Sequence, residues 1–282
     1  MRIDIWLITI FLFLSCISWA LGTAHRIQIG YCTPIKGIDE ARAAGFDFVE
    51  LRTSEIAGLS DSDFEKLKEK LERLGVSVPV TYLFIPGHIK LTGPDVNKRQ
   101  QMDYVVKAFD RVSLLGVQVV TLGSGAARQV PEGFSKEAGF GQLVDFCRRI
   151  APEARARNIT IAVEPQCRQE CNIINTAAEA LALVEAVNDP NIQLMIDFYH
   201  MVAEREDPAI ILKAKDHIRH LHIANPQGRV FPLRWDEYDY AGFFRNLHRI
   251  GYDKRISVEA GTQNFAREAP DSIAFLRRAF DQ

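Results

Sequence analysis

The chain has 282 residues, of which 47% are hydrophobic and 25% charged, and its formal net charge is -2. This composition excludes a disordered polymer, a disulfide-dense miniprotein and a polytopic membrane protein, because apolar residues are plentiful and cysteines are few. The near-neutral charge gives no electrostatic reason to expect nucleic acid as a partner.

An apolar run over residues 5–22 opens the chain, broken only by a few hydroxyl residues. It follows Arg2 and ends among small residues, which is the pattern of a cleaved signal peptide. We therefore predict that residues 1–24 are a signal peptide and that the protein is periplasmic or extracellular. Two alternatives stay open. The run is long enough for an N-terminal membrane anchor, and a misassigned start would leave a cytoplasmic protein.

Export would place the remaining cysteines in an oxidising compartment. Cys167 and Cys171 are four residues apart, just after a predicted strand. A local disulfide and a pair of reduced, partly buried thiols are both compatible with this spacing. A zinc knuckle is not, because no second cysteine pair or matching histidine pair follows.

From residue 25 onward, short runs rich in Ile and Val alternate with longer segments of helical periodicity. One helical segment, 62–74, repeats large apolar residues at intervals of three and four. The alternation predicts eight βα units. In chain order, the expected strands are residues 27–31, 48–51, 76–83, 117–122, 159–164, 192–197, 218–224 and 255–259.

We predict that residues 25–282 form a single (β/α)8 TIM barrel of the α/β class. The 258 residues after position 24 are close to the roughly 250 typical of this fold. Strands that are apolar on both faces suit a parallel sheet covered by helices. A doubly wound sheet is disfavoured, because the segment after the first strand, 30–34, lacks the glycine spacing of a dinucleotide-binding loop.

Each of the last four predicted strands carries a potential metal ligand at or near its end, namely Glu164, Asp197, His222 and Glu259. Their separations of 33, 25 and 37 residues each correspond to about one βα unit. Because the carboxyl ends of barrel strands meet at one face, these side chains are expected to surround one point. Three carboxylates and one imidazole suit a single divalent ion, with Mn²⁺ expected and Mg²⁺, Co²⁺ or Zn²⁺ as alternatives.

The segments around these ligands are the most distinctive part of the sequence. They read Glu164-Pro-Gln-Cys-Arg-Gln-Glu170, Asp197-Phe-Tyr-His200, His220-Leu-His222 and Val258-Glu259. In these segments the chain resembles the sugar phosphate isomerase/epimerase family of xylose isomerase-like TIM barrels, and in particular its ketose 3-epimerase branch. The resemblance covers nearly all of residues 25–280.

The resemblance implies a role for each residue. Glu164 and Glu259 would be metal ligands that also transfer the proton, while Asp197 and His222 would mainly hold the metal. Substrate contacts are implied for Glu170, His200 and Arg229. After His222 the chain departs from the family pattern, since Asn225 replaces an acidic residue and Arg229 is shifted by one position.

The first half of the chain offers fewer candidates. Glu50 ends the second predicted strand and His88 follows the third, and of the two we expect Glu50 to line the pocket. Residues 123–134, which include Arg128, resemble the family's fourth loop. This resemblance implies that the loop covers the substrate.

These features predict a metal-dependent sugar isomerase or epimerase. One glutamate would remove the proton next to the carbonyl of a keto sugar, and the other would return it, through a metal-stabilised enediolate. Epimerisation and aldose–ketose isomerisation need the same ligands. A keto-sugar or inosose dehydratase or lyase is one alternative, and a secreted, non-catalytic sugar-binding barrel is another.

The expected partner is therefore a small sugar or sugar derivative. A homo-oligomer is also compatible with the sequence, and membrane association is expected only if the N-terminal segment is not cleaved. Apurinic endonucleases share the barrel but need additional histidine ligands and an Asp-x-His element, which this chain lacks. The net charge also opposes binding to nucleic acid.

Overall fold

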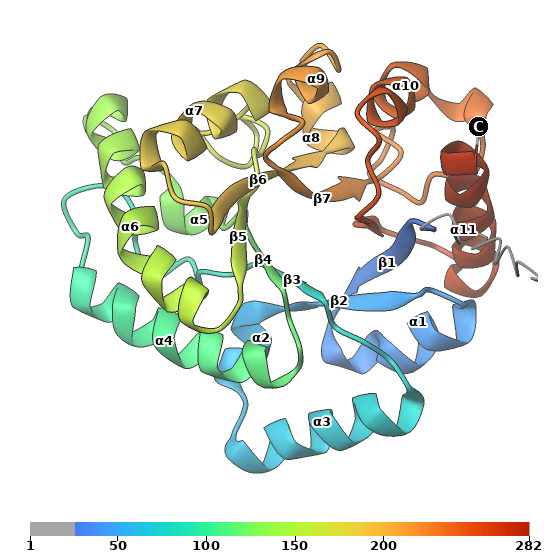
Figure 1. Cartoon of the computed structure of the whole chain (residues 1–282), viewed down its shortest axis with the longest axis horizontal. Coiled ribbons are helices and arrows are strands. Elements are labelled where there is room, and N and C mark those ends of the chain that lie inside the picture. Colours follow the sequence, from blue (N-terminus) through green and yellow to red (C-terminus); the bar gives the residue numbers. More distant parts are fainter. Residues whose placement is uncertain (1–25, 282) are drawn as a thin grey trace, which may run out of the picture.

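A computed structural model describes residues 26–281 of the chain. The predicted signal segment, residues 1–24, lies outside the described residues. Eight strands pair in sequential order and close into a parallel barrel, and helices surround it on the outside (Figure 1). The predicted (β/α)8 barrel is therefore confirmed.

The strands are β1 Gln28–Thr33, β2 Phe48–Arg52, β3 Val80–Tyr82, β4 Val119–Leu122, β5 Thr160–Val163, β6 Ile192–Asp197, β7 Ile218–Ile223 and β8 Arg255–Val258. The α-helices are α1 Ile38–Ala44, α2 Thr53–Gly58, α3 Asp61–Leu74, α4 Lys98–Leu114, α5 Gly125–Arg128, α6 Lys136–Ala156, α7 Ala177–Val187, α8 Phe198–Ala203, α9 Ile210–Ala214, α10 Ala241–Arg249 and α11 Phe265–Asp281. Two short 3₁₀ helices are η1 Ile35–Gly37 and η2 Trp235–Glu237.

The third strand is shorter than its predicted range, 76–83. β3 begins only at Val80, directly after Pro79. Proline has no backbone N–H and cannot donate to a neighbouring strand. The residues before it therefore lie outside β3, although the backbone oxygens of Ser77 and Pro79 accept hydrogen bonds from Val49 and Gln118.

Side-chain caps fix the beginnings of four longer helices, α3, α4, α6 and α7. The side-chain oxygen of Ser60 accepts a hydrogen bond from the backbone N–H of Asp63 at the start of α3. Equivalent caps at α4, α6 and α7 are Asn97, Ser135 and Thr176. Each cap satisfies a backbone donor that has no partner within its helix.

Alternation along the strands divides the apolar residues into two layers. Val49 and Leu51 of β2 point outward into the large cluster beneath the helices. Phe48 and Glu50 therefore face the barrel interior. Phe48 belongs to a separate inner cluster with Val80, Val119, Ala162 and Met195.

The inner cluster forms the floor of the site. Ala162 lies two residues before Glu164, and Met195 lies two residues before Asp197. Because side chains repeat on one face every second residue, the next inward layer toward the strand ends is polar. The barrel thus places charged side chains directly above an apolar layer that excludes water.

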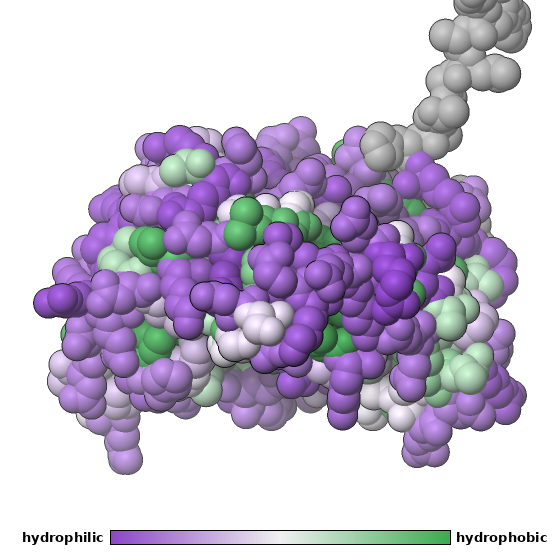
Figure 2. All heavy atoms as spheres, turned by 90° about the horizontal axis from the view of Figure 1, so that it is seen from below, coloured by the Kyte–Doolittle hydropathy of each residue, from purple (hydrophilic) through white to green (hydrophobic). Residues whose placement is uncertain are grey.

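The outer surface is mostly hydrophilic. In the face shown in Figure 2, polar residues predominate and hydrophobic residues form separate small patches. Among residues 26–281, no helix combines the length and apolarity needed to span a membrane.

Candidate metal centre and active site

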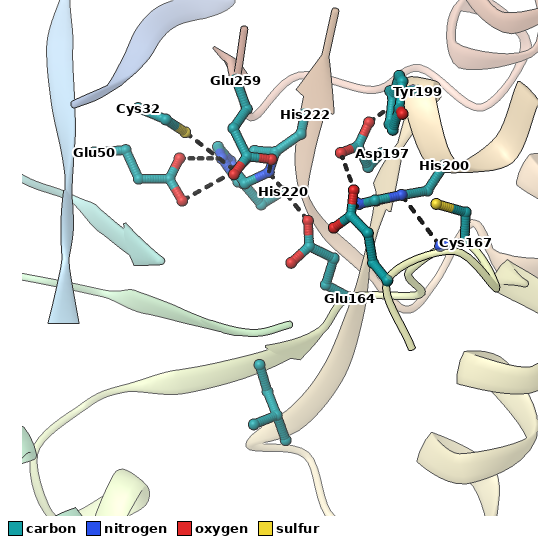
Figure 3. A network of polar contacts seen from close by, with 12 residues as sticks. Cys32, Glu50, Glu164, Cys167, Asp197, Tyr199, His200, His220, His222 and Glu259 are labelled. Carbon is teal, nitrogen blue, oxygen red and sulfur yellow. Dashed lines mark hydrogen bonds and ion pairs between the residues drawn. The ribbon is translucent and has the colours of Figure 1, made fainter. Parts of the chain in front are cut away.

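The four predicted metal ligands converge at the carboxyl ends of neighbouring strands (Figure 3). Asp197 is the last residue of β6, and His222 lies one residue before the end of β7. Glu164 and Glu259 directly follow β5 and β8. One ligand atom from each of the four lies within 4.8 Å of the others.

Several atoms of this cluster are buried without a hydrogen-bond partner. Nδ1 of His222 lies 3.3 Å from Oε1 of Glu164 and 3.4 Å from Oε2 of Glu259. Neither Nδ1 of His222 nor Oε1 of Glu164 forms a hydrogen bond, and the same is true of Oδ2 of Asp197. Such atoms are rare in folded proteins. An imidazole nitrogen and carboxylate oxygens that face one another in this way fit one divalent cation.

The two carboxylate oxygens of Asp197 have different surroundings. Its Oδ1 accepts a hydrogen bond from the backbone N–H of Tyr199 at 2.7 Å and caps the short helix α8. Its Oδ2 is left to face the cluster. The same carboxylate therefore serves as a helix cap and as a candidate metal ligand.

The electrostatics of the cluster reflect three carboxylates in a small buried volume. Burial raises the pKa of Asp197, and although His200 opposes this effect, the charge of Glu259 adds to it. Burial also acts on Glu259, but His222 and Arg229 outweigh it and hold its pKa below the usual value. Positive charge is therefore what this cluster requires.

His222 carries part of that charge when no metal is bound. Burial opposes its charged form, but the neighbouring Glu50 carboxylate outweighs this and raises the pKa of the imidazole well above its usual value. Burial likewise acts on Glu50, whose pKa His222 and His220 nevertheless hold below its usual value. Binding of a cation at Nδ1 of His222 therefore competes with a proton.

Arg229 contacts the ligand cluster and is partly exposed, although its position in the sequence departs from the family pattern. Its guanidinium donates to Oε1 of Glu170 at 2.7 Å and to Oε2 of Glu259 at 2.9 Å. The same group lies 4.5 Å from the centroid of the Tyr199 ring. The loop after β7 thus brings this predicted substrate-contacting residue onto the ligand cluster.

His200 and Glu170 complete the predicted set. The backbone N–H of Cys167 donates to Nδ1 of His200 at 3.1 Å, so in the neutral ring the proton lies on Nε2. Nε2 has no hydrogen-bond partner and lies 3.6 Å from Oδ2 of Asp197 and 3.9 Å from Oε2 of Glu170. His200 therefore presents a donor toward the site.

The remaining sequence candidates have different positions. His88 is exposed, whereas Arg128 is buried and donates to the backbone oxygens of Leu122 and Glu164 at 3.0 and 2.7 Å. Arg128 thus holds two strand ends together. Cys167 and Cys171 are buried and free, without a disulfide between them.

The sequence predicted no role in the site for Cys32, and Gly123 entered only as part of the loop 123–134. A Cβ atom on Gly123 would lie 2.0 Å from Oε2 of Glu164, so only glycine leaves room for that carboxylate. Sγ of Cys32 lies 3.6 Å from Nε2 of His222. Alternate residues of β1 face the barrel interior, and this alternation could have predicted that Cys32 lies near the site. No sequence pattern predicts the space needed at Gly123.

The comparisons with known proteins agree with this architecture. A family model described as xylose isomerase-like TIM barrel matches residues 38–279. The ketose 3-epimerase of Arthrobacter globiformis is 27% identical over 241 residues, which are 85% of this chain and 81% of that protein. The L-ribulose 3-epimerase of Methylomonas sp. (strain DH-1) is 30% identical over 231 residues, 80% of this chain and 77% of that protein.

A solved structure of D-psicose 3-epimerase in the presence of D-fructose has a TM-score of 0.80 to this chain. It covers 91% of this chain and 100% of its own, at 18% identity, and so shows a shared fold. Fold and site together define a (β/α)8 barrel with a carboxylate and histidine cluster at its strand ends. The chain belongs to the xylose isomerase-like TIM barrel family, because the family model matches most of its length.

Proposed function

We propose that the protein is a divalent-metal-dependent sugar epimerase that acts on a ketose at C3. The relatives named ketose 3-epimerase and L-ribulose 3-epimerase support the reaction class. The observation that carries the metal dependence is the set of buried atoms without partners on His222, Glu164 and Asp197. Hard oxygen ligands suit both Mg²⁺ and Mn²⁺, and Mn²⁺ is the ion that we propose.

A divalent ion bound there supplies a Lewis acid that makes the proton beside the sugar carbonyl easier to remove. Glu164 and Glu259 follow β5 and β8, and each approaches Nδ1 of His222 from its own strand. One of them removes the proton from C3, and the other delivers a proton to the opposite face of the same carbon. This transfer inverts C3 without changing the rest of the sugar.

The other polar groups of the site hold the substrate. Nε2–H of His200 is a free donor, and the carboxylate of Glu170 and the guanidinium of Arg229 lie beside it. These groups suit the hydroxyl and carbonyl oxygens next to C3. By ordering the sugar, they keep C3 between the two glutamates.

Hydrogen exchange tests this proposal. Metal-depleted protein and protein reconstituted with Mn²⁺ are incubated with L-ribulose, D-psicose or D-fructose in D₂O, and NMR follows C3–H. We expect deuterium at C3 and the C3 epimer, and only with metal. An unsaturated product would identify a dehydratase or lyase instead, and sugar binding without exchange would identify a non-catalytic barrel.

We also propose that residues 1–24 direct export and are then removed. The support is the basic start, apolar run and small residues of this segment. The intact mass of the protein recovered from the producing cell tests the proposal. We expect a chain that begins at His25, and a full-length mass would contradict it.

A further inference from the structure

Glu50 is a fully buried carboxylate that the proposed proton transfer does not use. It lies on β2 with a relative exposure of 0% and faces the barrel interior, one layer above Phe48. Figure 3 shows its side chain reaching toward the two histidines of β7. A buried carboxylate destabilises the folded state unless hydrogen bonds or opposite charges compensate it.

Each oxygen of Glu50 faces one imidazole. Oε2 lies 2.8 Å from Nε2 of His220, and Oε1 lies 3.0 Å from Nε2 of His222. Both histidines have 0% relative exposure. The carboxylate is therefore held by two rings whose centroids are 5.0 Å apart and nearly perpendicular.

An ionised carboxylate has no hydrogen to give, so both contacts require the proton on Nε2 of the ring. In the neutral, metal-binding form of His222 this leaves Nδ1 as the nitrogen with a lone pair. Nδ1 is also the atom that faces Glu164 and Glu259. The hydrogen bond from Nε2 thus leaves the lone pair of Nδ1 available to bind a cation.

We infer that Glu50 is a positioning residue that holds His222 with its proton on Nε2 and its Nδ1 directed at the divalent ion. The inference rests on the proposed function, because that function supplies the ion. Metal-binding histidines commonly need such an outer partner, which fixes the tautomer and the ring orientation.

Cys32 is the other neighbour of the same nitrogen. Its Sγ lies 3.6 Å from Nε2 of His222, and this cysteine is buried and free. A thiol sulfur is a weak acceptor compared with a carboxylate oxygen. Glu50 therefore determines where the proton of His222 lies, and Cys32 fills the space beside it.

The test compares Glu50→Gln with the wild type and with Thr53→Val. The amide introduced by Glu50→Gln places a donor toward one of the two histidines and leaves only a neutral acceptor for the other. Thr53→Val is the matched control, because it removes a buried hydrogen bond to Thr81 just beyond the same strand, away from His222. Titration with Mn²⁺, followed by calorimetry, measures the dissociation constant.

We expect the dissociation constant for Mn²⁺ to rise about 10- to 100-fold in Glu50→Gln and to be unchanged in Thr53→Val. The turnover rate of Glu50→Gln should recover at saturating Mn²⁺, because the defect is in metal affinity. Wild-type affinity in Glu50→Gln, or the same loss in both variants, would overturn the inference.

A second measurement needs no variant. ¹⁵N NMR of the wild-type protein loaded with diamagnetic Zn²⁺ reports which nitrogen of His222 carries the proton. A proton on Nε2 is expected, and a proton on Nδ1 would overturn the inference even if Glu50→Gln fails to fold. If the wild type binds no metal, the proposed function fails and the inference fails with it. A failure of the inference alone leaves wild-type metal binding intact.

Discussion

Nδ1 of His222 and Oε1 of Glu164 are 3.3 Å apart, and each is buried without a hydrogen-bond partner. Leaving such groups unsatisfied costs about 1–3 kcal/mol each. A cation bound between these atoms would therefore stabilise the folded protein. The dependence of stability on metal can be measured directly.

Metal should raise the thermal stability of the folded protein. A ligand that binds only the folded state, at 100 times its dissociation constant, adds about 2.7 kcal/mol. For a domain of this size, that corresponds to an increase in Tm of roughly 5–10 °C. Differential scanning calorimetry with EDTA and then with excess Mn²⁺ measures the shift. Equal Tm values under the two conditions would contradict a metal site in the folded protein.

Replacing Asp197 with Ala should abolish stoichiometric metal binding. The substitution removes one of three candidate carboxylate ligands and also the cap of α8. Elemental analysis after gel filtration measures occupancy, and circular dichroism checks the fold. Asp216→Ala is a matched control, because Asp216 is exposed and its side chain has no hydrogen bond. Unchanged occupancy in Asp197→Ala would show that the ligand assignment is wrong.

Glu259→Gln should stop proton exchange while the fold remains intact. Loss of a positioned acid or base typically lowers the rate by 10²- to 10⁴-fold. The same D₂O experiment at saturating Mn²⁺ separates this loss from weaker metal binding. Glu185→Gln, on the exposed face of α7, is the control. Exchange at the wild-type rate in Glu259→Gln would remove this residue from the mechanism.

The convergence of the four candidate ligands was predictable because strand ends in a parallel barrel share one face. The position of Asp197 at the end of a predicted strand is enough to place it on that face. The partner of a ligand depends instead on contacts across the barrel. Glu50 meets His222 from 172 positions away, and no local pattern predicts that pairing.

The position of a side chain was harder still to predict where it depends on an unusual backbone conformation. Arg229 adopts a φ of 50°, a left-handed conformation that is rare outside glycine. This turn brings its guanidinium to Glu170 and Glu259 in spite of the shifted sequence position.

The predicted bounds of the third strand were wrong for a local reason. The prediction followed the hydrophobic pattern of residues 76–83 and gave too little weight to Pro79, which has no backbone N–H to donate.

Gly123→Ala should weaken metal binding through Glu164, although residue 123 is not itself a candidate ligand. The added Cβ would lie 2.0 Å from Oε2 of Glu164 and 2.9 Å from Nε2 of Gln166, so the carboxylate must move. We expect the dissociation constant for Mn²⁺ to rise at least about tenfold, as is typical when the surroundings of a ligand are changed. Calorimetric titration measures it.

Gly141→Ala is the matched control for this substitution. Its added Cβ meets no atom within 4 Å, and the residue lies inside α6. Alanine in a helix interior should stabilise the protein by about 0.5–1 kcal/mol and leave metal affinity unchanged. Equal metal affinity in the two alanine variants would contradict the steric role of Gly123.

The four described cysteines should resist alkylation in the folded protein. All four are free and buried: Cys32, Cys147, Cys167 and Cys171. Burial raises the pKa of Cys147 to about 12, so almost none of it is thiolate at pH 8. Mass spectrometry after iodoacetamide treatment should find these residues unmodified in buffer and all four modified in urea without a reductant. If only Cys32 and Cys147 were alkylated in urea, Cys167 and Cys171 would be joined by a disulfide, in conflict with their free state in the structure.

The thiol of Cys147 also makes stability depend on alkaline pH. Its pKa is higher in the folded state than its ordinary value of about 9, so the folded chain retains a proton that the unfolded chain loses above that pH. Its contribution to the free energy of unfolding is therefore complete below pH 9 and declines as the pH rises toward 12. Urea unfolding of the wild type and Cys147→Ala between about pH 8 and 10 should show a steeper decline for the wild type. Parallel declines in the two proteins would mean that this thiol does not titrate differently in the folded and unfolded chains.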